Sequence, residues 1–336
     1  MKSIIIGALA VIVSISCATE VFAQTGTYHI SKIFHIGGTG GWDYLAVYGH
    51  KLYVSHGNQV NIVDKDSGDS LDCIQHTDGV HGIAFIPELN KGYISNGQLN
   101  TVTVFELSTD KVLSQIKTGE NPDFIFYEKF TRHIITCNGK SHDLSIIDPV
   151  NEKVLSTLPV GGKPETAVSD ETGHLFVNIE DRNEIANVNL QTNRIENRWS
   201  LLPGKSPTGL AFDKSSRRLF AGCDALLIVL DADKGTVVGK LPIGEGCDGV
   251  VFDSKNKTIL ASNGEGTMSV IQEKSAMQYE TFKNIPTKKS ARTIALDEQT
   301  QRVYLPAADL DIHSEPGKRP APVAGSFQVI VMTRGK

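Results

Sequence analysis

Residues 80–120 read VHGIAFIPELNKGYISNGQLNTVTVFELSTDKVLSQIKTGE. Apolar and polar residues alternate here in four short runs, at positions 81–87, 91–95, 101–107 and 111–117. Alternation with a period of two and many β-branched residues are typical of strands. The Asn, Asp, Gly and Ser residues between the runs are typical of tight turns. This stretch therefore predicts four antiparallel strands joined in chain order.

The same unit recurs along the chain. Its second strand ends alike in several repeats, as LYVSHG (52–57), GYISNG (92–97) and ILASNG (259–264) show. The repeats begin 38 to 44 residues apart, at Trp42, Val80, Pro122, Pro164, Pro207, Cys247 and Ala291. Four strands in each period of about 40–45 residues are the signature of a β-propeller. We therefore predict an all-β, seven-bladed β-propeller of four-stranded antiparallel blades.

The seventh repeat reaches the end of the chain after its third strand, QVIVMTRG (328–335). A strand of the missing kind stands near the other end, because TYHISKIFHIGG (27–38) resembles the fourth strand KVLSTLPVGG (153–162). We expect this N-terminal strand to complete the seventh blade and close the ring. Closure would remove the exposed sheet edges that an open array leaves.

The first 23 residues have the pattern of a signal peptide. Lys2 precedes an apolar run, and Val21-Phe22-Ala23 offers small residues at the two positions that a signal peptidase recognises. We expect cleavage after Ala23, a single domain over residues 24–336, and a periplasmic or secreted protein. The alternative is a lipoprotein lipidated at Cys17, which is less favoured because Ser14 replaces the usual Leu. No later stretch is apolar over the roughly 18 residues of a membrane span.

Composition limits the function classes. The formal net charge of -5 argues against a nucleic-acid partner, which usually meets a basic surface. Four of the five cysteines follow the expected cleavage site, too few for a disulfide scaffold in a chain of 336 residues. Cys223 and Cys247 fall on the same face of adjacent blades, and whether they pair is left open. No C-x-x-C-H occurs, so no covalent haem is expected.

Strand order predicts where the polar residues gather. The second residue of each innermost strand and the residue that ends each second strand belong to the same face. We call the first set the mouth residues; they are Asp43, His81, Asp123, Glu165, Thr208, Asp248 and Arg292. We call the second set the hairpin residues; they are His56, Asn96, Asn138, Glu180, Asp224 and Asn263. Both sets are expected to converge around the central channel.

Two interpretations of these residues stay open. Carboxylate and amide oxygens suit Ca²⁺, and His56 and His81 add ligands for Zn²⁺ or another transition metal. Crowded carboxylates also raise one another's pKa, which suits a general base. The alternative is a polar channel mouth that only holds water. Arg292 either neutralises the ring or binds an anionic ligand. The insertion at residues 309–326 is either a binding loop or a solvated Pro-rich excursion.

These repeats resemble the YVTN-repeat, YncE-like family of bacterial seven-bladed propellers over the whole mature chain. The literal tetrapeptide is absent, and LYVSHG and GYISNG are its nearest forms. The resemblance implies an exported propeller and hardly bears on activity, since most members have no assigned reaction. We expect a monomeric binding or scaffold protein that takes a small molecule or a protein on this face. The alternative is a metal-dependent, lactonase-like hydrolase that uses the carboxylate and histidine ring.

Overall fold

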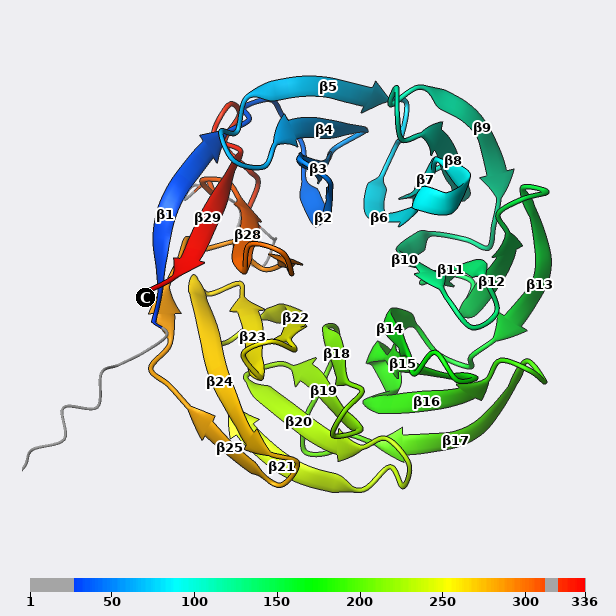
Figure 1. The fold of residues 1–336 in the computed structure, drawn as a ribbon, viewed down its shortest axis with the longest axis vertical. Helices are drawn as coiled ribbons and strands as arrows, with labels where there is room; N and C mark the ends of the chain where they lie inside the picture. The colour runs from blue at the N-terminus through cyan, green and yellow to red at the C-terminus, as the bar shows by residue number, and fades with distance from the viewer. Residues whose placement is uncertain (1–26, 312–319, 336) are drawn as a thin grey trace, which may run out of the picture.

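The alternating runs form strands that gather into seven sheets around a central axis (Figure 1). The computed structural model describes residues 27–311 and 320–335. The expected signal peptide lies outside these residues. Each blade is antiparallel, and in all but the seventh the strands follow chain order outward from the channel, which confirms the predicted seven-bladed propeller.

The first four blades follow the repeat closely. Blade 1 consists of β2 (Trp42–Tyr48), β3 (Lys51–His56), β4 (Gln59–Asp64) and β5 (Ser70–Gln75). Blade 2 consists of β6 (Val80–Ile86), β7 (Lys91–Asn96), β8 (Thr101–Glu106) and β9 (Val112–Lys117). Blade 3 consists of β10 (Pro122–Glu128), β11 (His133–Asn138), β12 (Asp143–Asp148) and β13 (Lys153–Pro159). Blade 4 consists of β14 (Pro164–Ser169), β15 (His174–Ile179), β16 (Glu184–Asn189) and β17 (Arg194–Ser200).

The next two blades vary at their edges. Blade 5 has a short inner strand and consists of β18 (Leu210–Asp213), β19 (Arg218–Cys223), β20 (Leu226–Asp231) and β21 (Val237–Pro242). Blade 6 consists of β22 (Cys247–Asp253), β23 (Thr258–Asn263), β24 (Thr267–Ser275) and β25 (Gln278–Thr281), and β26 (Ile285–Pro286) also pairs with β24. Within the described residues, two short 3₁₀ helices, η1 (Pro87–Leu89) and η2 (Glu180–Arg182), follow β6 and β15. Among the described residues no helix is long and apolar enough to cross a membrane.

The seventh blade joins the two ends of the chain. It consists of β27 (Ala295–Asp297), β28 (Arg302–Ala307), β29 (Gln328–Arg334) and, outermost, β1 (Tyr28–His35). β1 pairs antiparallel with β29, from Tyr28 opposite Arg334 to His35 opposite Gln328. Closure by the N-terminal strand is therefore confirmed.

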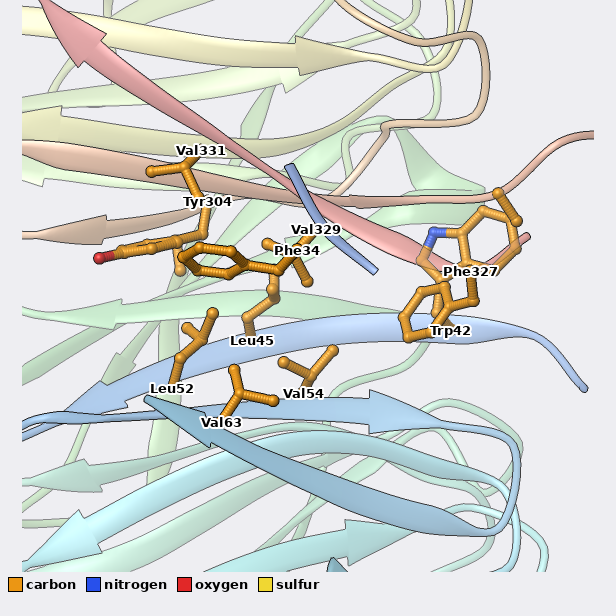
Figure 2. Packing of buried hydrophobic residues seen from close by; sticks show 12 residues of the cluster. Phe34, Trp42, Leu45, Leu52, Val54, Val63, Tyr304, Phe327, Val329 and Val331 are labelled. Carbon is orange, nitrogen blue, oxygen red and sulfur yellow. The ribbon is translucent and has the colours of Figure 1, made fainter. Parts of the chain in front are cut away.

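The hydrophobic core lies between neighbouring blades. At the seam between blades 7 and 1, Leu52 and Val54 of blade 1 face Tyr304 and Val329 of blade 7, and all four are fully buried (Figure 2). Phe34 of β1 packs into the same cluster, so the closing strand contributes to the core as well as to the sheet. Burial of one such side chain stabilises the fold by about 1.5–3 kcal/mol.

The tyrosine of the repeated second strand links one blade to the next. Tyr53, Tyr93 and Tyr304 are fully buried at equivalent positions. Their hydroxyls donate hydrogen bonds to the outer turn of the following blade, at Asp110 Oδ1 (2.8 Å), the Pro149 carbonyl (3.2 Å) and the Lys65 carbonyl (3.1 Å). The aromatic ring fills the space between blades, and the hydroxyl satisfies its hydrogen bond there.

Candidate functional site

A β-bulge stands at the start of most inner strands and positions the mouth residues. In blade 3, Pro122 pairs with Asn138 and Ile125 with Thr136, so two residues of β10 face one residue of β11. The register shifts in the same way after Trp42, Val80, Pro164 and Cys247. A bulge redirects side chains and bends its strand. The mouth residue and the residue after it therefore both become available to the channel.

Serines of the second strands hold the mouth residues of the next blade by their backbone. The bonds run from Ser55 Oγ to the His81 carbonyl, from Ser95 Oγ to the Asp123 carbonyl and from Ser262 Oγ to the Arg292 carbonyl, each at 2.5 Å. These serines precede the hairpin residue in LYVSHG, GYISNG and ILASNG. The repeated serine thus fixes the ring of mouth residues from blade to blade.

His81 lies between two carboxylates of the neighbouring blades. Its Nδ1 is 2.6 Å from Asp43 Oδ2 and 3.6 Å from Asp123 Oδ1. Burial lowers the pKa of His81, but the carboxylates of Asp123 and Asp43 outweigh burial and raise that pKa to about 9. Burial and the charges of Asp43 and Asp248 raise the pKa of Asp123 to about 6, against the opposing effect of His81. At neutral pH the three residues therefore form a group built around an imidazolium.

The same three residues can also hold a metal ion. Asp43, His81 and Asp123 each offer one ligand atom, and these atoms all lie within 4.8 Å of one another. Two carboxylates and an imidazole suit Zn²⁺ or another transition metal better than Ca²⁺, which prefers oxygen ligands alone. A metal would compete with the proton of His81, because only the neutral imidazole coordinates.

The remaining charged mouth residues have partners of their own. Arg292 forms an ion pair with Asp248, and its Nη2 donates to the Trp42 carbonyl at 3.0 Å. These contacts favour the neutralising role for Arg292 over capture of an anionic ligand. In blade 4, Lys163 Nζ lies 2.6 Å from Glu165 and 2.5 Å from Glu180. Burial and the charge of Asp123 still hold the pKa of Glu165 well above its usual range.

A cavity of about 220 Å³ lies in the channel beside these residues. Asp248 lines it, together with the residues that directly follow other mouth residues, notably Tyr44, Phe124 and Thr166. The rings of Tyr44 and Phe124 meet edge to face, with centroids 5.7 Å apart. Burial, followed by the charges of Asp123 and Asp43, raises the pKa of Tyr44 well above its usual range. The cavity is therefore mostly apolar, and the Tyr44 hydroxyl lies near the negative charges of Asp123 and Asp43.

Glycines in the same layer serve the packing of the inner strands. A Cβ atom on Gly209 would lie 2.6 Å from the amide nitrogen of Val250, and one on Gly249 would lie 2.7 Å from Ile294 Cγ2. Neighbouring inner strands thus approach too closely for a side chain at these positions. These glycines therefore allow the close packing of neighbouring inner strands.

The hairpin residues do not reach the mouth as expected. Asn96, Asn138 and Asn263 are fully buried. Their amides bond side chains of their own third strand, at Thr101 and Thr103, Asp143 and Ser145, and Thr267 and Ser269, over 2.7–3.1 Å. His56 is also buried, and its ring stacks on Phe327 with centroids 4.1 Å apart. The expected convergence of the two sets is therefore wrong for these four residues, which are buried within the blades.

Other predicted features have different outcomes. Cys223 and Cys247 are both buried and free, so the possible disulfide between them is not formed. Asp224 Oδ1 accepts a hydrogen bond from the Gly246 amide and so belongs to a turn. The insertion is described only at its two ends, where Leu310 forms a bridge with Pro322 and the Gly325 amide donates to the Gly38 carbonyl at 2.7 Å. A binding role for this insertion stays a prediction.

Sequence reasoning missed Tyr44, Phe124 and Lys163. A signal was present, because Tyr44 and Phe124 hold the same place in their repeats, one position after a mouth residue. Simple alternation would turn that side chain away from the channel. The bulge breaks this alternation and lets the side chain face the channel. No sequence pattern predicts the bulge.

Comparison with known proteins supports the fold alone. No protein-family model matches the chain, and no curated protein matches its sequence. Among solved structures, the chain is similar to hydrazine synthase of Kuenenia stuttgartiensis, with a TM-score of 0.70. The match covers 80% of this chain and 92% of that one, at 12% sequence identity. The likeness is one of architecture. At this identity it says nothing about the reaction or the ligand.

Proposed function

We propose that this chain is an exported binding protein of the YVTN-repeat, YncE-like kind, and that it captures a small cation at the channel mouth. The observation that carries the proposal is the cavity with carboxylates of neighbouring blades gathered beside it. Among the described residues, the nearest cationic atom to the Asp123 carboxylate is His81 Nδ1, at 3.6 Å, beyond hydrogen-bond distance. A bound cation would give Asp123 a closer cationic partner than His81.

The supporting features extend beyond the site. The pattern of residues 1–23 supports export with cleavage after Ala23, and the repeated second strand supports the family. The formal net charge of -5 supports a partner other than nucleic acid. The cavity is small and lined by residues of the inner strands, which favours a small molecule over a protein. We propose that the ring works as a monomer, because closure leaves no sheet edge between its first and last blades.

A second candidate function is a metal-dependent hydrolase of the lactonase-like kind. The group of Asp43, His81 and Asp123 favours it, since three ligand atoms so close together leave further positions on an ion open for a substrate. Elemental analysis of the purified chain tests this candidate. Stoichiometric Zn²⁺ or Ca²⁺, with lactone hydrolysis lost after chelation, would support it. A purified chain without bound metal, or one whose lactone hydrolysis survives chelation, would contradict it.

Thermal unfolding of the mature, chelator-treated chain tests the binding function. The probes are Ca²⁺, Zn²⁺, n-butylammonium, n-butanol and butyrate, so that charge is varied separately from size. At least one cation should raise the midpoint, by the equivalent of about 2.7 kcal/mol at 100 times its dissociation constant. The neutral and anionic probes should not.

Two variants with the same change of charge locate the binding. Asp123→Asn should abolish the shift in midpoint. Glu120→Gln should keep it, because Glu120 is exposed in the turn before the same inner strand. Failure of every cation, or an equal shift in Asp123→Asn, would contradict the proposed function.

A further inference from the structure

The cavity carries information about the class of cation, if the proposed binding function holds. Its volume of about 220 Å³ is far larger than a single metal ion requires. A divalent ion is held by several oxygen or nitrogen ligands at about 2.0–2.6 Å, and most of the cavity wall offers none. The wall consists mainly of aliphatic and aromatic side chains of the inner strands. The space therefore suits an organic molecule.

The aromatic pair favours a positive charge on that molecule. Tyr44 and Phe124 line the same cavity, and their rings meet edge to face. Aromatic faces attract ammonium groups and contact apolar carbon equally well. Asp123 directly precedes Phe124 in the bulge of β10, so this carboxylate belongs to the residue next to one that lines the cavity.

Ionised carboxylates outnumber cationic side chains at the mouth. Within the described part of the chain, five carboxylates form this group: Asp43, Asp123, Glu165, Glu180 and Asp248. Three cationic side chains face them, namely His81, Lys163 and Arg292. Lys163 is shared by two of the carboxylates, and His81 by two others. A monovalent cation reduces this excess of negative charge without displacing a side chain.

We infer that the cavity takes a small alkylammonium compound, with its ammonium group at Asp123 and its apolar tail against Tyr44 and Phe124. Both parts of the ligand then meet matching chemistry. The carboxylate supplies a charge-assisted hydrogen bond, and the aromatic and aliphatic wall removes the tail from water. A primary amine is the simplest member of this class.

Calorimetric titration of the mature chain with methylammonium, n-butylammonium, n-butanol, butyrate and Ca²⁺ tests the inference. Each methylene group buried should tighten binding about fourfold. We therefore expect n-butylammonium to bind at least about 10-fold more tightly than methylammonium, with no measurable binding of n-butanol or butyrate.

Substitutions at the carboxylate and at the aromatic pair assign the two ends of the ligand. Asp123→Asn should weaken n-butylammonium binding by at least about 10-fold, and Glu120→Gln should leave it unchanged. Phe124→Leu should reduce the advantage of n-butylammonium over methylammonium, and Tyr44→Leu supplies the same test if Phe124→Leu does not fold. If folded Phe124→Leu or Tyr44→Leu still binds n-butylammonium more tightly than methylammonium by the same factor as the unchanged chain, the inference is overturned.

The outcomes separate the inference from the function on which it rests. Binding of Ca²⁺ through Asp123, with no binding of n-butylammonium, would overturn the inference and leave the proposed function standing. Equal affinity for methylammonium and n-butylammonium would also overturn it, because the tail would then contact nothing. Absence of binding by every cation would contradict both.

Discussion

Buried charged residues of this propeller are paired in most places, and Glu273 in blade 6 is an exception. Only 6% of its surface is exposed. Its Oε1 accepts a hydrogen bond from Ser216 at 2.8 Å, while its Oε2 has no partner among the described residues. Nearby Asp213 is already held by Lys257 at 3.0 Å. Burial, with the contribution of Asp213 and against the Ser216 bond, raises the pKa of Glu273 to about 7.

This raised pKa predicts a dependence of stability on pH. The folded state holds the Glu273 proton more tightly than the unfolded state does, so the free energy of unfolding falls as pH rises from 4.5 to about 7. One pKa unit corresponds to about 1.4 kcal/mol, and the fall from this residue reaches about 3 kcal/mol at most. Glu273→Gln should remove this part of the dependence. Its stability relative to the unchanged chain should therefore be greater at pH 8 than at pH 5.

Urea unfolding at the two pH values measures the difference. Glu280→Gln is the matched control, because Glu280 lies in the same blade with about half of its side chain exposed. A Glu273→Gln variant that follows the unchanged chain at both pH values would show that the Glu273 proton does not matter.

At the scale of elements, the repeated second strand is the unit that builds the ring. Its tyrosine bonds the outer turn of the next blade, and its serine bonds the carbonyl of the next mouth residue. Its asparagine stays within the blade. Each of these three residues of the motif thus has a structural role. Together they fix the positions of the strands that bear the mouth residues.

Deletion of residues 24–38 tests the element that closes the ring. The deletion removes β1, exposes the edge of β29, and takes the buried Tyr28 and Phe34 from the core. We expect a lower unfolding midpoint and association through the open edge. Calorimetry and light scattering measure the two effects. A chain that begins at Thr27 is the control, and equal stability and monomeric behaviour of the two chains would rule out the closing role of β1.

At the scale of the whole molecule, the features that could be predicted from the sequence are those that recur in every repeat. The seven repeats predicted the seven blades, and the additional strand sequence at 27–38 predicted closure of the ring. The shared register predicted that Asp43, His81 and Asp123 would meet. The direction of a single side chain was harder to predict. Asn96 turns to Thr101 and Thr103 within its blade, and the bulge turns Phe124 to the cavity. Both outcomes depend on local pairing that a period of two does not contain.

The proposed location of the molecule gives a prediction about its N-terminus. A basic start, an apolar run and Val21-Phe22-Ala23 predict that the exported chain begins at Gln24. Mass spectrometry of the protein recovered from outside the cytoplasm measures this directly. A mature chain that begins with a lipidated Cys17 would replace this prediction with the lipoprotein alternative.

The most direct test of the central claim is a crystal structure of the mature chain grown with n-butylammonium. The account predicts electron density for one ligand in the central cavity, with its nitrogen within hydrogen-bond distance of the Asp123 carboxylate and its tail in contact with Tyr44 and Phe124. Water alone in the cavity at saturating ligand, or a ligand bound elsewhere on the propeller, would contradict the account.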